Sequence, residues 1–321
     1  MTTVQLACEA MATRFELVLA GRREEALRAA GEEAIEEIHR LEAALSLYRP
    51  DSQIAEVNRA AASRPVRVTP EVFGLLRHAL QLCEVTDGAF DITVAPLLRA
   101  WGLMRGTGRM PDPASLAEAR SAVGYRHVRL DAGLGTVSFA REGVMVDLGS
   151  IGKGYALDRA AELLREAGVE RGLIHGGTST AVALGRGDDG TAWKVAVTAP
   201  RLAAGPGAAE RDRPLSVVEL EDESLSVSAV WGKGFEAEGR YFGHVMDPSR
   251  GEPVSGALLA AIVLPSATES DALSTALLVR GEEMVERLRG GGVSVRCLVV
   301  LPAPGGTGYR VVSSGMESSV S

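Results

Sequence analysis

The sequence predicts an α+β fold in which mixed sheets pack against helices. Expected strands and helices follow one another along the 321 residues without the regular alternation of a doubly wound sheet. No Gly-x-Gly-x-x-Gly motif joins an expected strand to a helix, which counts against a Rossmann domain. With 46% hydrophobic residues, the chain can bury a sizeable core. We therefore expect a single domain over 1–321, with a flexible tail from about residue 310.

Charge and composition argue against several classes of function. The net charge of −8 and the pI near 5.3 count against nucleic-acid binding and against a basic membrane-surface protein. No stretch approaches the roughly 20 apolar residues of a spanning helix, so no integral membrane segment is expected. The first residues show no export signal, which predicts a cytoplasmic protein, although an exported protein whose signal had been removed would look the same.

The three cysteines predict neither a zinc site nor a disulfide framework. Cys8, Cys83 and Cys297 lie far apart in the sequence, and no Cys-x-x-Cys spacing occurs. Cys83 falls within an apolar helical pattern, so we expect it in the core.

Helices in the first half of the chain are predicted from apolar spacing and capping residues. Residues 23–47 place apolar side chains on one helical face, and Pro50 prevents the helix from continuing. Asp51 or Ser52 can cap a short helix through residue 57, and a longer helix starts at Thr69-Pro70, with the proline in its first turn. The other elements expected here are strands at 11–20, 127–130 and 136–139, a helix at 115–123, and a strand or helix start at 92–98.

The second half reads mainly as apolar strands. The elements expected here are strands at 144–146, 173–177, 192–199, 215–220, 225–230, 240–246, 260–264 and 295–301, helices from about 155, at 269–279 and at 282–290, and a surface loop at 201–213.

The stretch Val144–Asp158 has the pattern of an anion-binding turn. A short apolar strand is followed by three glycines, by Lys153 and by the start of a helix. Glycines allow close approach of the backbone to a phosphate, and the amides of a helix N-terminus favour negative charge. We expect a phosphate-bearing cofactor here, with a solvated side chain as the alternative for Lys153. The stretch is not a Walker P-loop, because Gly154 follows the lysine.

Asp271 and Thr275 lie four residues apart on an expected helix and therefore share a face. A carboxylate and a hydroxyl are hard oxygen ligands that suit Mg²⁺, which takes few protein ligands beside phosphate oxygens. The alternative is that Asp271 only interacts with the helix dipole from the first turn.

His244 and several turn residues are further candidates. His244 lies at a strand end, and the ordinary pKa of histidine, about 6.5, suits a base near neutral pH; a structural role is the alternative. Tyr48 and Phe90 are aromatic residues in turns, where they could stack on a flat ring or fill an edge of the core. Asp91 and Asp147 could bind a ring N–H or cap backbone donors.

Taken together, seven segments resemble the ApbE family, the FAD:protein FMN transferases. They follow the family's order and span most of the chain: MATRFE (11–16), LSLYRPDSQIAEVN (45–58), TDGAFDITVAPLLRAWG (86–102), VDLGSIGKGYALDRAAELL (146–164), GLIHGG (172–177), HVMDPSRGEPV (244–254) and ESDALSTALLVRG (269–281). The resemblance implies an ApbE, T-fold-like α+β domain with the ligand site between subdomains. It also implies Mg²⁺-dependent transfer of FMN from FAD to a Thr or Ser hydroxyl of an acceptor flavoprotein, with AMP released.

The same resemblance implies roles for individual residues. The positions that match FAD contacts are Met11, Tyr48, Ala89, Phe90, Asp91 and Asp147. Ser150, through its backbone carbonyl, Asp271 and Thr275 match the Mg²⁺ positions, and His244 matches the base. Lys153 could hold pyrophosphate oxygens.

Two positions depart from the family pattern. Thr178 follows Gly176-Gly177 where many members have Asp, and Ala229 stands where many have Gly. Both put FAD affinity or acceptor choice in question. Two alternative functions therefore stay open: an FAD pyrophosphatase that releases FMN and AMP, and a non-catalytic FAD-binding protein.

Overall fold

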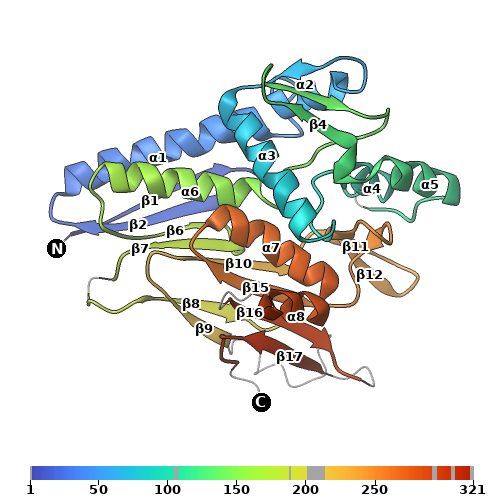
Figure 1. Cartoon of the computed structure of the whole chain (residues 1–321). Helices are drawn as coiled ribbons and strands as arrows, with labels where there is room; N and C mark the ends of the chain where they lie inside the picture. The colour runs from blue at the N-terminus through green and yellow to red at the C-terminus, as the bar shows by residue number, and fades with distance from the viewer. Residues whose placement is uncertain are drawn as a thin grey trace. The chain divides into compact units, whose positions relative to one another are not determined.

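The computed structural model describes residues 2–104, 108–187, 189–200, 214–290, 295–304 and 308–318 (Figure 1). The loop predicted at 201–213 lies outside these residues. Contacts within the chain divide it into two compact units. The first comprises Met1–His39, Lys153–Ser228 and Gly256–Ser321, and the second comprises Arg40–Gly152 and Ala229–Ser255. The single domain expected over 1–321 stays a prediction.

The first unit is built on an eight-stranded sheet of order β1-β2-β6-β7-β10-β15-β16-β17. Its strands are β1 (Thr2–Ala10), β2 (Thr13–Gly21), β6 (Arg171–Gly176), β7 (Thr180–Leu184), β10 (Ser224–Ala229), β15 (Leu259–Leu264), β16 (Arg296–Pro302) and β17 (Tyr309–Ser314). Strands distant in sequence become neighbours, since β10 pairs antiparallel with β7 and lies beside β15. The mixture of hairpins and long connections gives the predicted α+β class.

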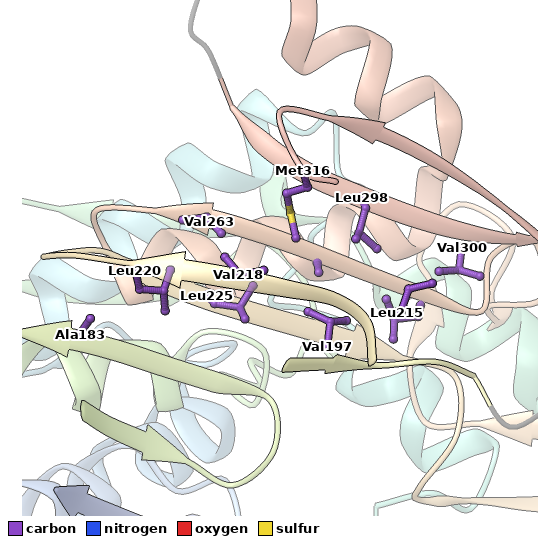
Figure 2. Close-up of a cluster of buried hydrophobic side chains, with 12 residues drawn as sticks. Ala183, Val197, Leu215, Val218, Leu220, Leu225, Val263, Leu298, Val300 and Met316 are labelled. Atoms are coloured by element: carbon purple, nitrogen blue, oxygen red, sulfur yellow. The ribbon is translucent and has the colours of Figure 1, made fainter. Parts of the chain in front are cut away.

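Helices cover one face of this sheet and a hairpin covers the other (Figure 1). The helices are α1 (Glu24–Leu45), which continues into the second unit, α6 (Gly152–Glu166), α7 (Ala267–Arg280) and α8 (Glu282–Gly290). The hairpin is β8 (Trp193–Thr198) with β9 (Pro214–Leu220). Side chains alternate along the strands, so Leu259 and Ala261 of β15 both join the core under the hairpin. Leu225 of β10 and Val218 of the hairpin lie in the same core (Figure 2).

The second unit holds the remaining elements. Its helices are α2 (Gln53–Ala60), α3 (Pro70–Val85), α4 (Ala95–Ala100), α5 (Pro113–Ala122) and the 3₁₀ turn η1 (Tyr125–His127). Its strands form three small sheets: β3 (Val66–Arg67), β5 (Thr136–Phe139) and β4 (Val128–Asp131); β11 (Gly234–Ala237) and β12 (Arg240–Gly243); and β13 (Met246–Asp247) and β14 (Glu252–Pro253). Of the two cap candidates for α2, Ser52 is the cap, because its side chain accepts the amide of Ala55. The helix start predicted at Thr69-Pro70 is confirmed, and the Thr69 side chain caps it by accepting the amide of Val72. No helix in the described ranges is both long enough and apolar enough to cross a membrane.

Two of the expected elements are wrong. Residues 144–146 form no strand, because the side-chain amide of Asn58 pairs with both the N–H and the C=O of Val146 in place of a neighbouring strand. The chain from 310 is not a flexible tail through its whole length, since β17 pairs with β16 from Tyr309 to Ser314. The sequence also gave no indication of β1 or β11, which are held by pairing with β2 and β12.

The cysteines are thiols in different environments, which predicts their reactivity. Burial raises the pKa of both Cys83 and Cys297, whereas Cys8 is half-buried. Each unit of pKa rise lowers the thiolate fraction about tenfold, and the thiolate is the reactive form.

With a thiol reagent at pH 8, we expect Cys8 to be labelled first and the other two more than about tenfold more slowly. Peptide mapping after short labelling measures this, with urea-unfolded protein as the control in which all three react; fast native labelling of Cys83 would contradict its placement in the core.

Candidate functional site

Asp271 lies where α6 and α7 of the first unit meet. The residue is 4% exposed, and its Oδ2 accepts the Gly154 N–H at 3.1 Å. The ammonium of Lys153 is 3.6 Å from the same oxygen. The acid in the first turn of α7 is Glu269, while Asp271 lies two residues further along, at the start of the second turn. Its position therefore does not match the helix-dipole alternative, and its carboxylate instead binds a backbone amide at the start of α6.

Gly154 permits this close approach of the two helices. A Cβ at position 154 would lie 2.1 Å from the carbonyl oxygen of Ala267 and 2.9 Å from the Cβ of Asp271. Only a residue without a side chain fits here. Gly154 of the predicted anion-binding turn thus has a packing role in addition to any ligand contact.

Replacing Gly154 with alanine is expected to destabilise the protein. The new methyl group would push backbone atoms of α7 away, at a cost of about 1–3 kcal/mol or more. Gly152→Ala is the matched control, because its Cβ would meet only the Cβ of Leu148, at an ordinary 3.9 Å. The midpoints of urea unfolding without FAD compare the two variants. Equal midpoints would contradict the tight contact between α6 and α7.

A second carboxylate, Asp158, fixes α6 against the start of α7. It accepts hydrogen bonds from the hydroxyl of Ser266, the amide of Ala267, and the amide and hydroxyl of Thr268, at 2.6–2.9 Å. These donors lie at the N-terminus of α7, where a helix has no carbonyl of its own to accept them, so the Asp158 side chain of α6 supplies the acceptor. Sequence reasoning missed this role, because a cap donated from a distant segment leaves no local signal.

Thr275 follows Asp271 by one helical turn, and its hydroxyl is 3.3 Å from that of Ser228 on β10. Within the described residues, no group of three or more His, Cys, Asp or Glu could hold a metal ion. Hard oxygen ligands from one carboxylate, hydroxyls and carbonyls fit a magnesium ion that keeps waters and phosphate ligands. Oδ2 of Asp271 accepts the Gly154 amide, and the donor set of Asp271 and Thr275 is compatible with Mg²⁺.

Met11 belongs to the first unit and Ser150 to the second. Met11 and Ala12 form the turn between β1 and β2, and both have positive φ, 50° and 58°. Two-residue hairpin turns require this backbone, which non-glycine residues adopt at a cost. Ser150 is half-buried in the turn that precedes α6.

His244 follows β12 in the second unit and is held by a backbone carbonyl. Its Nδ1 is 3.1 Å from the carbonyl oxygen of Lys233. Because a carbonyl can only accept, Nδ1 carries the proton in the neutral ring, and Nε2 has the lone pair. A histidine in this tautomer can take a proton at Nε2.

An aromatic cluster supports the hairpin that carries His244. The rings of Trp101, Phe235 and Phe242 lie with centroids 5.4–6.4 Å apart, in the core of the second unit. The Trp101 indole N–H donates to the carbonyl of Gly251 at 3.0 Å. The loop containing His244 is therefore anchored on both sides of the histidine.

Ala89, Phe90 and Asp91 are buried within the second unit. The Asp91 carboxylate accepts the amide and hydroxyl of Thr93 and the amide of Tyr125. Burial raises the pKa of Asp91, and these hydrogen bonds oppose the rise. Phe90 is 2% exposed, which agrees with the core alternative. A contact of this segment with FAD stays a prediction.

Tyr48 and Asp147 lie nearer the surface of the same unit. Tyr48 is 48% exposed, and its amide donates to the hydroxyl of Ser46. Asp147 is half-buried and caps its own turn by accepting the amide of Gly149 at 2.8 Å.

The two departures from the family pattern differ in exposure: Thr178 is exposed in the turn between β6 and β7, and Ala229 is half-buried at the end of β10.

Comparisons with known proteins identify the family. The model of the ApbE family matches residues 11–295. The chain belongs to the ApbE family. Two relatives are both named FAD:protein FMN transferase. The protein from Treponema pallidum (strain Nichols) is 33% identical over 80% of this chain and 73% of its own length. The protein from Klebsiella pneumoniae (strain 342) is 30% identical over 86% of this chain and 77% of its own length. The crystal structure of the ApbE protein from Thermotoga maritima matches 98% of this chain and 97% of its own, with a TM-score of 0.86 and 27% identity. The resemblance and the α+β fold predicted from the sequence are thus confirmed.

Proposed function

We propose that this protein is an FAD:protein FMN transferase, which moves the FMN part of FAD onto an acceptor flavoprotein and releases AMP. The observation that carries the proposal is the family match over 11–295, together with relatives of that name that align over four fifths of the chain or more. The oxygen ligands offered by Asp271 and Thr275 are compatible with a metal ion that also binds phosphate oxygens.

The proposed metal residues are Asp271 and Thr275 of the first unit and the backbone carbonyl of Ser150. A bound Mg²⁺ would neutralise charge that develops on the pyrophosphate oxygens. Lys153 is proposed to bind one of those oxygens, and its 3.6 Å distance from Asp271 keeps its ammonium beside the carboxylate. The proposed FAD contacts are Met11, Tyr48, Ala89, Phe90, Asp91 and Asp147. Since the Phe90 ring is buried, we expect the Ala89–Asp91 segment to use main-chain atoms.

The proposed reaction is displacement at the phosphorus atom of the FMN part. The oxygen of an acceptor Thr or Ser forms a bond to this phosphorus, and the bond from phosphorus to the bridging pyrophosphate oxygen breaks. AMP leaves with that oxygen, and Nε2 of His244 takes the hydroxyl proton. The carbonyl of Lys233 supports this role, because it holds Nδ1 as the donor nitrogen.

The products distinguish transfer from the alternatives. The protein is incubated with FAD, Mg²⁺ and purified flavoprotein domains, and flavin fluorescence is then sought on denatured acceptor. We expect fluorescence that survives denaturation. Free FMN and AMP without labelled protein would instead show a pyrophosphatase, and intact FAD would show a binding protein.

A further inference from the structure

Ser228 contacts the proposed metal residue Thr275 from the neighbouring strand. Along β10, Ser224 and Ser226 face α7, while Leu225 between them joins the apolar core on the other face of the sheet. Ser228 continues the hydroxyl side of this alternation. Its Oγ is 2.8 Å from the Oγ of Ser274 and 3.3 Å from the Oγ1 of Thr275.

The backbone carbonyl of Asp271 sets the direction of these hydrogen bonds. A carbonyl has no proton, so Ser274, whose Oγ lies 2.9 Å from it, must be the donor of that bond. The single hydroxyl proton of Ser274 is then used, and Ser228 must donate to Ser274. The proton of Ser228 is used in turn, so Thr275 must donate to Ser228.

Thr275 has one weaker alternative. Its Oγ1 is 3.4 Å from the carbonyl of Asp271. That carbonyl already accepts the hydroxyl of Ser274 and, in a regular helix, the amide of Thr275 itself. A carbonyl oxygen has two lone pairs, so the hydroxyl of Ser228 is the better acceptor.

We propose that Ser228 is a positioning residue for the metal site. Because Ser228 accepts the hydrogen bond that the Thr275 hydroxyl donates, the oxygen lone pairs of Thr275 can point toward a cation. Hydrogen-bond donation thus runs from the Thr275 hydroxyl to Ser228, from Ser228 to Ser274, and from Ser274 to the carbonyl of Asp271. We call this chain of three hydrogen bonds the relay. The inference rests on the proposed function, in which Asp271 and Thr275 bind Mg²⁺. Partners that orient a ligand commonly change metal affinity by 10–100-fold when they are removed.

Ser226 provides a matched control within the same strand. It lies two residues before Ser228 on the same face, fully buried, with its Oγ 2.8 Å from Ser270 and 3.2 Å from Thr180. Replacing Ser226 removes a hydroxyl from the same contact between β10 and α7, while the three hydrogen bonds of the relay stay in place. A general loosening of β10 against α7 would therefore affect both variants.

The test is calorimetric titration of Mg²⁺ into the complex of the full chain with FAD. We expect Ser228→Ala to bind Mg²⁺ roughly tenfold more weakly, Ser226→Ala to bind like the wild type, and Ser228→Thr to recover most of the loss. If Ser228→Ala does not fold, Ser228→Cys, of similar size but a weak hydrogen-bond partner, must show the same loss. Wild-type affinity in Ser228→Ala or in Ser228→Cys, or equal weakening in Ser226→Ala, would overturn the proposal.

Asp271→Ala separates this inference from the proposed function. If Asp271→Ala binds Mg²⁺ as tightly as the wild type, the metal assignment and the relay both fail. If Asp271→Ala loses binding while Ser228→Ala keeps it, the relay alone fails. Loss in both, with Ser226→Ala unchanged, supports both.

Discussion

Asp271→Asn is expected to lower the rate of flavin transfer by about a thousandfold. The proposed metal supplies several kcal/mol of transition-state stabilisation, and each 1.36 kcal/mol corresponds to about tenfold in rate. Asparagine keeps the size of the side chain and an oxygen that can accept the Gly154 amide, so the fold is retained while the charge beside Lys153 is lost. Initial rates of AMP release at several Mg²⁺ concentrations measure the effect.

Glu269→Gln is the matched control for this loss. Glu269 is an acid on the same helix, in its first turn, and no metal role is proposed for it. We expect its rate to stay within about fivefold of the wild type, since a helix-dipole interaction contributes about 1 kcal/mol or less at such a site, and each 1.36 kcal/mol corresponds to about tenfold in rate. Equal losses in the two variants would indicate a general charge effect and would contradict the specific role of Asp271.

His244→Gln is expected to lower turnover by about 10²–10⁴-fold, the usual range for a lost general base. The wild-type rate should rise as the imidazole loses its proton, because the base form must accept the proton of the acceptor hydroxyl. The glutamine variant should lose this rise with pH. Rates measured across the acidic and neutral range test both statements.

Two further variants separate proton transfer from packing. His78→Gln, in α3 of the same unit, is expected to keep both the rate and its pH dependence. Adding free imidazole should restore part of the activity of His244→Ala, since the small base can occupy the space of the missing ring. An unchanged pH profile in His244→Gln would show that the base lies elsewhere.

Elements with strong periodicity or local caps could be predicted from the sequence. The helix over Pro70–Val85 was predicted at both ends, because a proline in the first turn and an apolar pattern that ends near residue 85 are local signals. The strand predicted at 144–146 was wrong. Its apolar residues resemble a strand, but its backbone pairs with the side chain of Asn58. The strand β17 was missed, because polar residues end the chain and the ladder with β16 is a tertiary contact.

The candidate site shows the same division. The i, i+4 spacing predicted that Asp271 and Thr275 share a face of a helix, and α7 contains both. The cap from Asp158 and the contact between Ser228 and Thr275 join segments 46 or more residues apart. No local pattern encodes such contacts. The burial of Phe90 was also unpredictable, because a turn aromatic can face either solvent or core.

The most direct test of the account is the balance between AMP and protein-bound flavin. Both are measured in one reaction of the wild-type chain with FAD, Mg²⁺ and acceptor: AMP by chromatography, and bound flavin by the mass of the denatured acceptor. The account predicts that each AMP released is matched by one FMN attached to a Thr or Ser of the acceptor. AMP that appears with an equal amount of free FMN, and no mass increase on the acceptor, would contradict it.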